Sequence, residues 1–278
     1  MAGSSQTLAV RAGGIELNVQ VTGDGPAVVL LHGFPDSLHL WRAVVPHLVA
    51  AGYRVVALDQ RGCGDSPAPD GRAHYGIDRL VADVTGVLDA LGLHDPVHVM
   101  GHDWGAVVAW CLAMTQPQRV RSAVAISVGH PRAYALAGLE QKRKGLYTLA
   151  WQVPVLAERR LMANDWARMR HWLRDHPDAD ACLRDLARPG RLTAGLNWYR
   201  ANLVPVLWRR WPACPVPMLG ISGSEDHCLT EDQMADSGRH MAAAWRYECV
   251  KGARHWLPLE QPERIAQLAV EWFRKQGK

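Results

Sequence analysis

The sequence has little that marks a secreted, metal-binding or membrane-spanning protein. Its six cysteines form no C-x-x-C pair and no Cys/His cluster with the spacing of a metal site. The first residues lack the apolar segment with basic flanks that a signal peptide requires, and no apolar run is long enough to span a bilayer. We therefore expect reduced thiols, no bound metal, no membrane span and a cytoplasmic location.

The chain also lacks a large excess of positive or negative charge. The net charge is +4, but it is unevenly distributed. Residues 131–212 carry 15 Lys/Arg and 7 Asp/Glu, a balance of +8, whereas the remainder carries 16 and 20, a balance of −4. The basic residues are scattered and form no arm or tract, so the sequence does not support nucleic-acid binding. We interpret them as a solvated helical face, with attraction of an anionic substrate as the alternative.

The 278 residues suit one large α/β domain with an inserted subdomain. Short apolar runs predict strands at residues 7–11, 15–21, 28–31, 54–58, 97–100, 123–126, 218–222 and 246–250. Helical periodicity predicts helices at residues 41–51, 77–91, 104–115, 231–241 and 262–275. An initial hairpin followed by this alternation predicts a mostly parallel sheet with helices on both faces.

Residues 131–212 interrupt the alternation. They show no strand-like pattern, and they hold six of the chain's 12 tryptophans, at positions 151, 166, 172, 198, 208 and 211. Open α/β sheets bind ligands at the carboxyl ends of their strands, where an insertion after the sixth strand would lie. We therefore interpret 131–212 as a helical lid on a core formed by 1–130 and 213–278. Most of these tryptophans would hold the lid together.

The chain's most informative motif is GHDWG at 101–105, directly after a predicted strand. A strand that breaks at glycine, presents one reactive residue and restarts as a helix is typical of a nucleophile elbow. The reactive position, usually serine, is Asp103 here. A carboxylate is already ionised at neutral pH, so it needs no base to remove a proton before it attacks.

Two later loops supply partners for this nucleophile. Each follows a predicted strand, and they contain GSEDH at 223–227 and GARHW at 252–256. The order nucleophile, acid, histidine matches the triad order of this fold class. We predict Asp226 as the acid and His255 as the base, with Glu225 as the neighbouring alternative for the acid.

A turn after the third strand contains HGFP at 32–35. Such a turn can aim a backbone N–H at the developing charge on an attacked carbonyl. We predict the backbone N–H groups of Phe34 and Trp104 as the oxyanion hole. His32 and His102 are assigned to hydrogen bonds within the scaffold.

Together these motifs resemble those of the α/β-hydrolase-fold epoxide hydrolases and the related haloalkane dehalogenases. The resemblance extends over essentially the whole chain and includes RGCGDS at 61–66. It implies the α/β-hydrolase fold. It further implies that the protein is a hydrolase acting on ether bonds, which converts an epoxide to a vicinal diol. It also implies a covalent ester on Asp103 that is cleaved by water activated by His255 and Asp226. The expected partners are a small apolar epoxide and water, with no cofactor.

The lid distinguishes these two families. Epoxide hydrolases use two lid tyrosines to bind and protonate the epoxide oxygen. One precedes an aromatic-Gln-x-Pro segment, as Tyr147 precedes WQVP at 151–154, and the other lies in NWYR, as Tyr199 does at 197–200. The resemblance thus implies Tyr147 and Tyr199 as ring-opening acids. The expected substrate-binding side chains are Phe34, Trp104, Trp151, Trp198 and Trp256.

Other functions stay open at this point. A haloalkane dehalogenase needs two N–H donors for the halide. Trp104 could supply the first donor. The second donor is often an Asn, but this chain has Phe34 at that position. A lid tryptophan would then have to supply the second donor. Fluoroacetate dehalogenases usually carry Arg where this chain has Trp104. A biosynthetic cyclase or lyase and a non-catalytic small-molecule receptor are further alternatives. The sequence also allows a homodimer.

Overall fold

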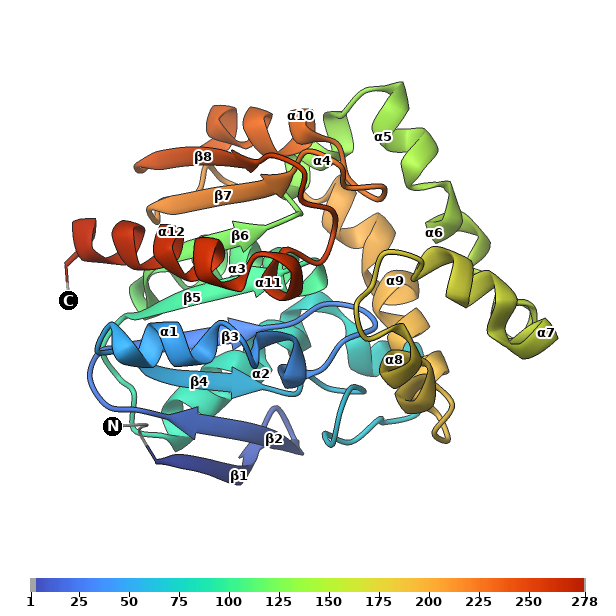
Figure 1. Ribbon diagram of the computed structural model, residues 1–278, viewed down its shortest axis with the longest axis horizontal. Helices are drawn as coiled ribbons and strands as arrows, with labels where there is room; N and C mark the ends of the chain where they lie inside the picture. The colour runs from blue at the N-terminus through green and yellow to red at the C-terminus, as the bar shows by residue number, and fades with distance from the viewer. Residues whose placement is uncertain (1–3, 278) are drawn as a thin grey trace.

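The computed structural model describes residues 4–277 and contains an eight-stranded sheet (Figure 1). The strands lie in the order β1-β2-β4-β3-β5-β6-β7-β8. Their bounds are β1 Ser5–Ala12, β2 Ile15–Thr22, β3 Ala27–Leu31, β4 Arg54–Leu58, β5 Val97–His102, β6 Val120–Ile126, β7 Met218–Gly223 and β8 Trp245–Val250. The pairs β1·β2 and β2·β4 are antiparallel and every other pair is parallel. The prediction of a hairpin followed by a mostly parallel sheet is confirmed.

Helices cover both faces of the sheet. The core helices are α1 Val45–Ala50, α2 Ile77–Ala90, α3 Trp104–Thr115, α10 Glu231–Ala235, α11 Leu257–Glu260 and α12 Pro262–Lys275. Figure 1 shows α1 and α12 in front of the sheet and α2 and α3 behind it. This arrangement buries every residue of β3 and β5, which explains why these strands are continuous apolar runs rather than alternating ones.

Two predicted core helices are shorter than the sequence pattern indicated. The helix predicted at 41–51 is a 3₁₀ turn at Leu38–Trp41 followed by α1, whose first turn contains Pro46. Proline fits the first turn of a helix but not its interior, so the two segments cannot merge. The helix predicted at 231–241 ends at Ala235 and continues as a 3₁₀ turn over Asp236–His240. The short α11 was not predicted.

Between β6 and β7 the chain forms helices and no strand. They are α4 Pro131–Leu136, α5 Leu139–Lys144, α6 Leu146–Ala150, α7 Leu156–Trp172, α8 Ala179–Leu186 and α9 Arg191–Trp208. Figure 1 shows that α5 to α9 lie beyond the arrowheads of the parallel strands, where α/β sheets bind ligands. We keep the name lid for residues 131–212. None of the helices within residues 4–277 is both long and apolar enough to cross a bilayer.

Candidate active site

Asp103 lies at the junction of β5 and α3, in a conformation that few residues adopt. Its φ and ψ are 51° and −120°, although it is not glycine. Such a backbone costs free energy and persists only where the surroundings enforce it. The turn is tight: a Cβ on Gly105 would overlap the backbone of Leu31, and one on Gly33 would overlap the Asp103 side chain. The strained turn thus presents the carboxylate above the end of β5.

The Asp103 carboxylate is buried and faces two of its predicted partners. Its Oδ1 accepts the backbone N–H of Phe34 at 2.9 Å. Its Oδ2 lies 3.8 Å from Nε2 of His255. Burial raises the pKa of Asp103; the charge of His255 and the backbone N–H groups of Phe34 and Trp104 lower it but do not fully offset burial. The two N–H groups predicted as an oxyanion hole therefore both act on this carboxylate.

Asp226 and His255 are in direct contact. Oδ2 of Asp226 accepts from Nδ1 of His255 at 2.8 Å, while its Oδ1 accepts the backbone N–H groups of Cys228 and Leu229 at 2.7 and 2.9 Å. Burial raises the pKa of Asp226, but His255 and these N–H groups hold it below its usual value. Glu225 is exposed, so the geometry favours Asp226 over this alternative.

His255 is fully buried, and its imidazole is electrostatically coupled to two carboxylates. Burial by itself would lower the pKa of His255, but Asp226 and Asp103 raise it to about 9. The backbone at His255 is also fixed, because its carbonyl oxygen accepts from Oγ of Ser127 at 3.1 Å and lies 2.9 Å from Nε2 of His102. His102 therefore bonds to the scaffold, as predicted from the sequence.

The two lid tyrosines approach Asp103 from different helices. Tyr199 on α9 is buried, and its hydroxyl has no hydrogen-bond partner within residues 4–277. Tyr147 on α6 is half-buried, and its ring centroid lies 6.4 Å from that of Tyr199. Burial raises the pKa of both phenols well above the ordinary value, and the charge of Asp103 raises them further. Both phenols are therefore neutral.

The NWYR motif fixes α9 through the neighbours of Tyr199. Arg200 forms a bidentate pair with Glu158 of α7, at 2.8 and 2.9 Å, and its Nε donates to the Trp151 carbonyl at 3.0 Å. The indole N–H of Trp198 donates to the Arg61 carbonyl in the core at 3.1 Å. Tyr199 is thus held between one residue bound to the lid and one bound to the core.

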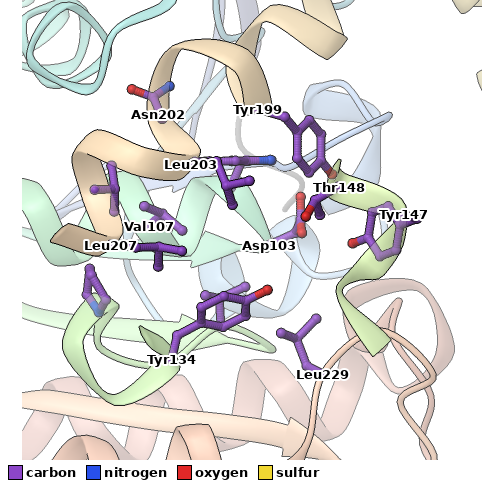
Figure 2. A pocket seen from close by; sticks show the side chains of 14 residues that line it. Asp103, Val107, Tyr134, Tyr147, Thr148, Tyr199, Asn202, Leu203, Leu207 and Leu229 are labelled. Atoms are coloured by element: carbon purple, nitrogen blue, oxygen red, sulfur yellow. The ribbon is translucent and has the colours of Figure 1, made fainter. Parts of the chain in front are cut away.

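A cavity of about 60 Å³ lies between Asp103 and the lid (Figure 2). Figure 2 shows the hydroxyls of Tyr147 and Tyr199 on the side of Asp103. The lining residues are Asp103, Trp104, Val107, Val128, Pro131, Tyr134, Tyr147, Thr148, Tyr199, Asn202, Leu203, Val206, Leu207 and Leu229. Most of this wall is apolar, and its polar groups gather near the carboxylate, as in a small-molecule site.

The side chains expected to bind substrate lie at different distances from this cavity. Trp104 lines the cavity, whereas Phe34, Trp151, Trp198 and Trp256 are not among the lining residues. Phe34 contributes its backbone N–H, while its ring packs edge-on against Trp151 with centroids 5.5 Å apart. Trp198 is turned toward the core by its hydrogen bond. Trp256 is fully buried against the His255 ring, with centroids 5.0 Å apart. Large aromatic side chains were needed here to pack the lid onto the core.

Sequence reasoning missed most of the apolar wall. Four of the missed residues lie on α9: Asn202, Leu203, Val206 and Leu207. They follow Tyr199 by three, four, seven and eight positions, which places them on the same face of the helix. From this spacing, the sequence could have predicted that these four residues share the face of the helix that carries Tyr199. Tyr134, Thr148 and Leu229 come from three separate segments, and no local pattern connects them.

Two clusters contain the residue types that bind metals. Asp226, Cys228 and His255 form one, and Asp36, His176 and Cys182 form the other. Burial raises the pKa of both thiols, so neither readily forms the thiolate that metals bind. The carboxylates and imidazoles are already hydrogen-bonded to each other, at 2.8 Å in the first cluster and 3.0 Å in the second. The hydrogen bonds between carboxylate and imidazole explain why the residues of each cluster lie close together.

Residues 26–262 match the family model described as alpha/beta hydrolase fold, so the chain is a member of that fold family. It is 35% identical to the AB hydrolase superfamily protein YfhM of Bacillus subtilis, covering 96% of this chain and 97% of that protein. It is 33% identical to epoxide hydrolase A of Mycobacterium tuberculosis, covering 95% and 96%.

Solved structures agree with these relatives. The crystal structure of epoxide hydrolase A from Mycobacterium thermoresistibile superposes with a TM-score of 0.83 at 29% identity, covering 98% of each chain. Epoxide hydrolase VrEH1 from Vigna radiata superposes with a TM-score of 0.82 at 28% identity, also over 98% of each chain. The chain belongs to the epoxide hydrolases of the α/β-hydrolase fold.

Proposed function

We propose that this protein hydrolyses epoxides to vicinal diols through an ester on Asp103. The observation that carries the proposal is the pairing, in one cavity, of a buried carboxylate with two neutral phenols from the lid. A carboxylate can attack a ring carbon, and the strained oxygen then needs a proton, which the phenols supply. The relatives named as epoxide hydrolases support this substrate class.

In the first step, Oδ2 of Asp103 forms a bond to one ring carbon as the carbon–oxygen bond of the epoxide breaks. Tyr147 and Tyr199 bind the departing oxygen, and one of them gives it a proton. The imidazolium of His255 can replace that proton, which leaves His255 neutral. The ester carries no charge, so its formation removes one of the two negative charges that raise the pKa of His255. The first step thus prepares the base for the second.

In the second step, neutral His255 removes a proton from water, which attacks the ester carbon of Asp103. The negative charge develops on the carbonyl oxygen of the ester, Oδ1 of Asp103, beside the backbone N–H groups of Phe34 and Trp104, so both can stabilise it. Asp226 orients the imidazole and stabilises its charged form. Collapse releases the diol, with the proton on His255 passing to the leaving oxygen. The carboxylic acid formed on Asp103 then gives its proton to His255, which restores the carboxylate and the imidazolium.

The alternative dehalogenase chemistry is less well supported by the cavity. Trp104 is the only tryptophan among the described lining residues, so it could be one halide donor. The indole N–H groups of Trp198 and Trp211 already donate to backbone carbonyls, at 3.1 and 2.8 Å. No second indole belongs to the described wall, whereas three phenols do, those of Tyr134, Tyr147 and Tyr199. A phenol can give a proton to a departing oxygen, so the phenols favour an oxygen leaving group over a halide.

The test compares styrene oxide, followed by diol formation, with a haloalkane followed by halide release. Diol formation is expected from the native protein and not from Asp103→Ala. A single turnover in heavy-oxygen water should place the label on Asp103, because water attacks the ester carbon. Halide release without diol formation, or undiminished diol formation by Asp103→Ala, would overturn the proposal.

A further inference from the structure

The loop that carries Asp226 makes few backbone hydrogen bonds of its own. It spans residues 224–230, between the end of β7 and the start of α10, and we call it the acid loop. Its first three backbone N–H groups donate to carbonyls of the core. The carbonyls of Asp226, Cys228 and Leu229, in contrast, accept from no backbone N–H within residues 4–277. All three residues are buried, and a buried carbonyl needs a donor.

Lys144, at the end of the lid helix α5, supplies donors for two of these carbonyls. Its Nζ donates to the carbonyl oxygen of Asp226 at 2.6 Å and to that of Leu229 at 3.1 Å. Its one ion pair within the described residues, with the exposed Glu140, is long at 3.9 Å. The ammonium group is therefore bound mainly to the acid loop. Hydrogen bonds from a charged donor are stronger than those between neutral groups.

Gln141 lies three positions before Lys144, on the same face of α5, and holds the remainder of the loop. Its Nε2 donates to the Cys228 carbonyl at 3.0 Å, and its Oε1 accepts the backbone N–H of Thr230 at 2.8 Å. The side chain is 2% exposed, so these bonds are shielded from water. An amide that donates and accepts at once fixes both the position and the direction of the loop backbone.

The other two members of the triad are anchored in the core. Asp103 lies at the junction of β5 and α3. The carbonyl of His255 is bound to Ser127 and His102. Asp226 is thus the member of the triad whose backbone carbonyl is held by the lid. A shift of α5 relative to the core would move Asp226 and leave the imidazole in place.

We propose that Lys144 and Gln141 are positioning residues, which hold Oδ2 of Asp226 in its 2.8 Å hydrogen bond to His255. This inference rests on the proposed function, and it affects the two steps unequally. Asp103 attacks the epoxide without a base, so ester formation depends little on the acid loop. Ester hydrolysis needs an imidazole that Asp226 orients and whose charged form it stabilises. Loss of the contacts from α5 should therefore slow the second step more than the first.

The test measures the two steps separately in Lys144→Met and Gln141→Leu. Both substitutions keep a side chain of similar size and remove its hydrogen bonds to the acid loop. Each should slow ester hydrolysis by about 10- to 100-fold, the loss that a displaced catalytic group brings. Stopped-flow fluorescence should show ester formation nearly unchanged. Intact-protein mass spectrometry should show the styrene oxide adduct accumulating on Asp103.

Two further variants separate positioning from a general effect on the lid. Arg143→Met is the matched control, since Arg143 is exposed on the same helix and makes no bond to the acid loop within the part of the chain that the structure describes. It should leave both steps unchanged. Lys144→Arg keeps a cationic donor and should recover part of the lost rate. Thermal unfolding checks that each variant is folded.

Proton NMR of the resting protein provides a readout that does not depend on turnover. The Nδ1 proton of His255 is protected from exchange with water while it is bonded to Asp226. Its signal should exchange faster in Lys144→Met and Gln141→Leu than in Arg143→Met. Absence of diol from every epoxide, styrene oxide included, would contradict the proposed function and leave this measurement valid.

Two outcomes would overturn the inference. One is an unchanged Nδ1 signal together with normal ester hydrolysis in both Lys144→Met and Gln141→Leu. The other is an equal slowing of ester formation and ester hydrolysis in these variants, which would mean that α5 supports the lid as a whole rather than Asp226.

Discussion

The Nε2 atom of His255 lies 3.8 Å from Oδ2 of Asp103, which is too far for a hydrogen bond. This nitrogen has no hydrogen-bond partner within the described residues, while the other ring nitrogen is bound to Asp226. A water molecule bridging such a gap would contact both the base and the carboxylate. The separation suits a histidine that acts on water rather than on the nucleophile.

His255→Gln should trap the ester. Attack by Asp103 needs no base, whereas water must lose a proton to cleave the ester, so removal of the imidazole should slow the second step by about 10²- to 10⁴-fold. Intact-protein mass spectrometry after mixing with styrene oxide should show one added substrate mass, located on the peptide that contains Asp103. The native protein should show little of this adduct. If His255→Gln turns over normally, His255 is not the base.

Asp103→Asn should lower the pKa of His255 below about 9, because it removes one of the two carboxylates that raise this value. The raised pKa also links folding to pH. Its stabilising contribution is complete below the unfolded pKa, about 6.5, and is lost as the pH rises through the folded pKa. The pH at which the variant loses this contribution should therefore be lower than in the native protein.

Titration of His255 by NMR and denaturant unfolding across the pH range would measure both effects. Asp24→Asn provides a control, because Asp24 lies in the exposed turn between β2 and β3. It should leave the His255 titration unchanged. An unchanged pKa in Asp103→Asn would show that the two groups are not coupled.

Tyr147→Phe and Tyr199→Phe should each slow ester formation, and the double variant should lose most of it. Each phenylalanine keeps the ring packing but removes the proton that the epoxide oxygen needs, so a loss of about 10²-fold or more is expected for the pair. Stopped-flow tryptophan fluorescence during the first turnover would report the rate. Tyr53→Phe is the control, because Tyr53 packs against Phe273 in the core and lines no part of the cavity. Equal loss in the control would point to a general effect on folding.

Arg200→Met should destabilise the protein by about 3 kcal/mol, because it leaves the Glu158 carboxylate buried without its partner. The double variant Arg200→Met with Glu158→Met should regain most of this loss. Equilibrium unfolding in urea would measure both. Arg170→Met, which breaks an exposed pair with Asp180, should have little effect. A single variant as stable as the native protein would mean that the pair does not hold α9.

The sequence by itself determined the succession of strands and most core helices along the chain, the nucleophile elbow, and the loops that carry Asp226 and His255. These features are local: a strand end, a glycine turn and a helix start follow one another within a few residues. It also marked Tyr147 and Tyr199 through adjacent motifs. The lid's role as a separate subdomain and the catalytic roles of these residues stay predictions.

Only the tertiary structure decided which side chains face the cavity. Trp198 and Trp256 had the chemistry of a substrate wall, but one binds the Arg61 carbonyl and the other packs under His255. Tyr134 and Leu229, nearly a hundred residues apart, meet at that wall because the lid folds over the sheet. The direction of a side chain depends on contacts between distant segments, and no short pattern in the chain records those contacts.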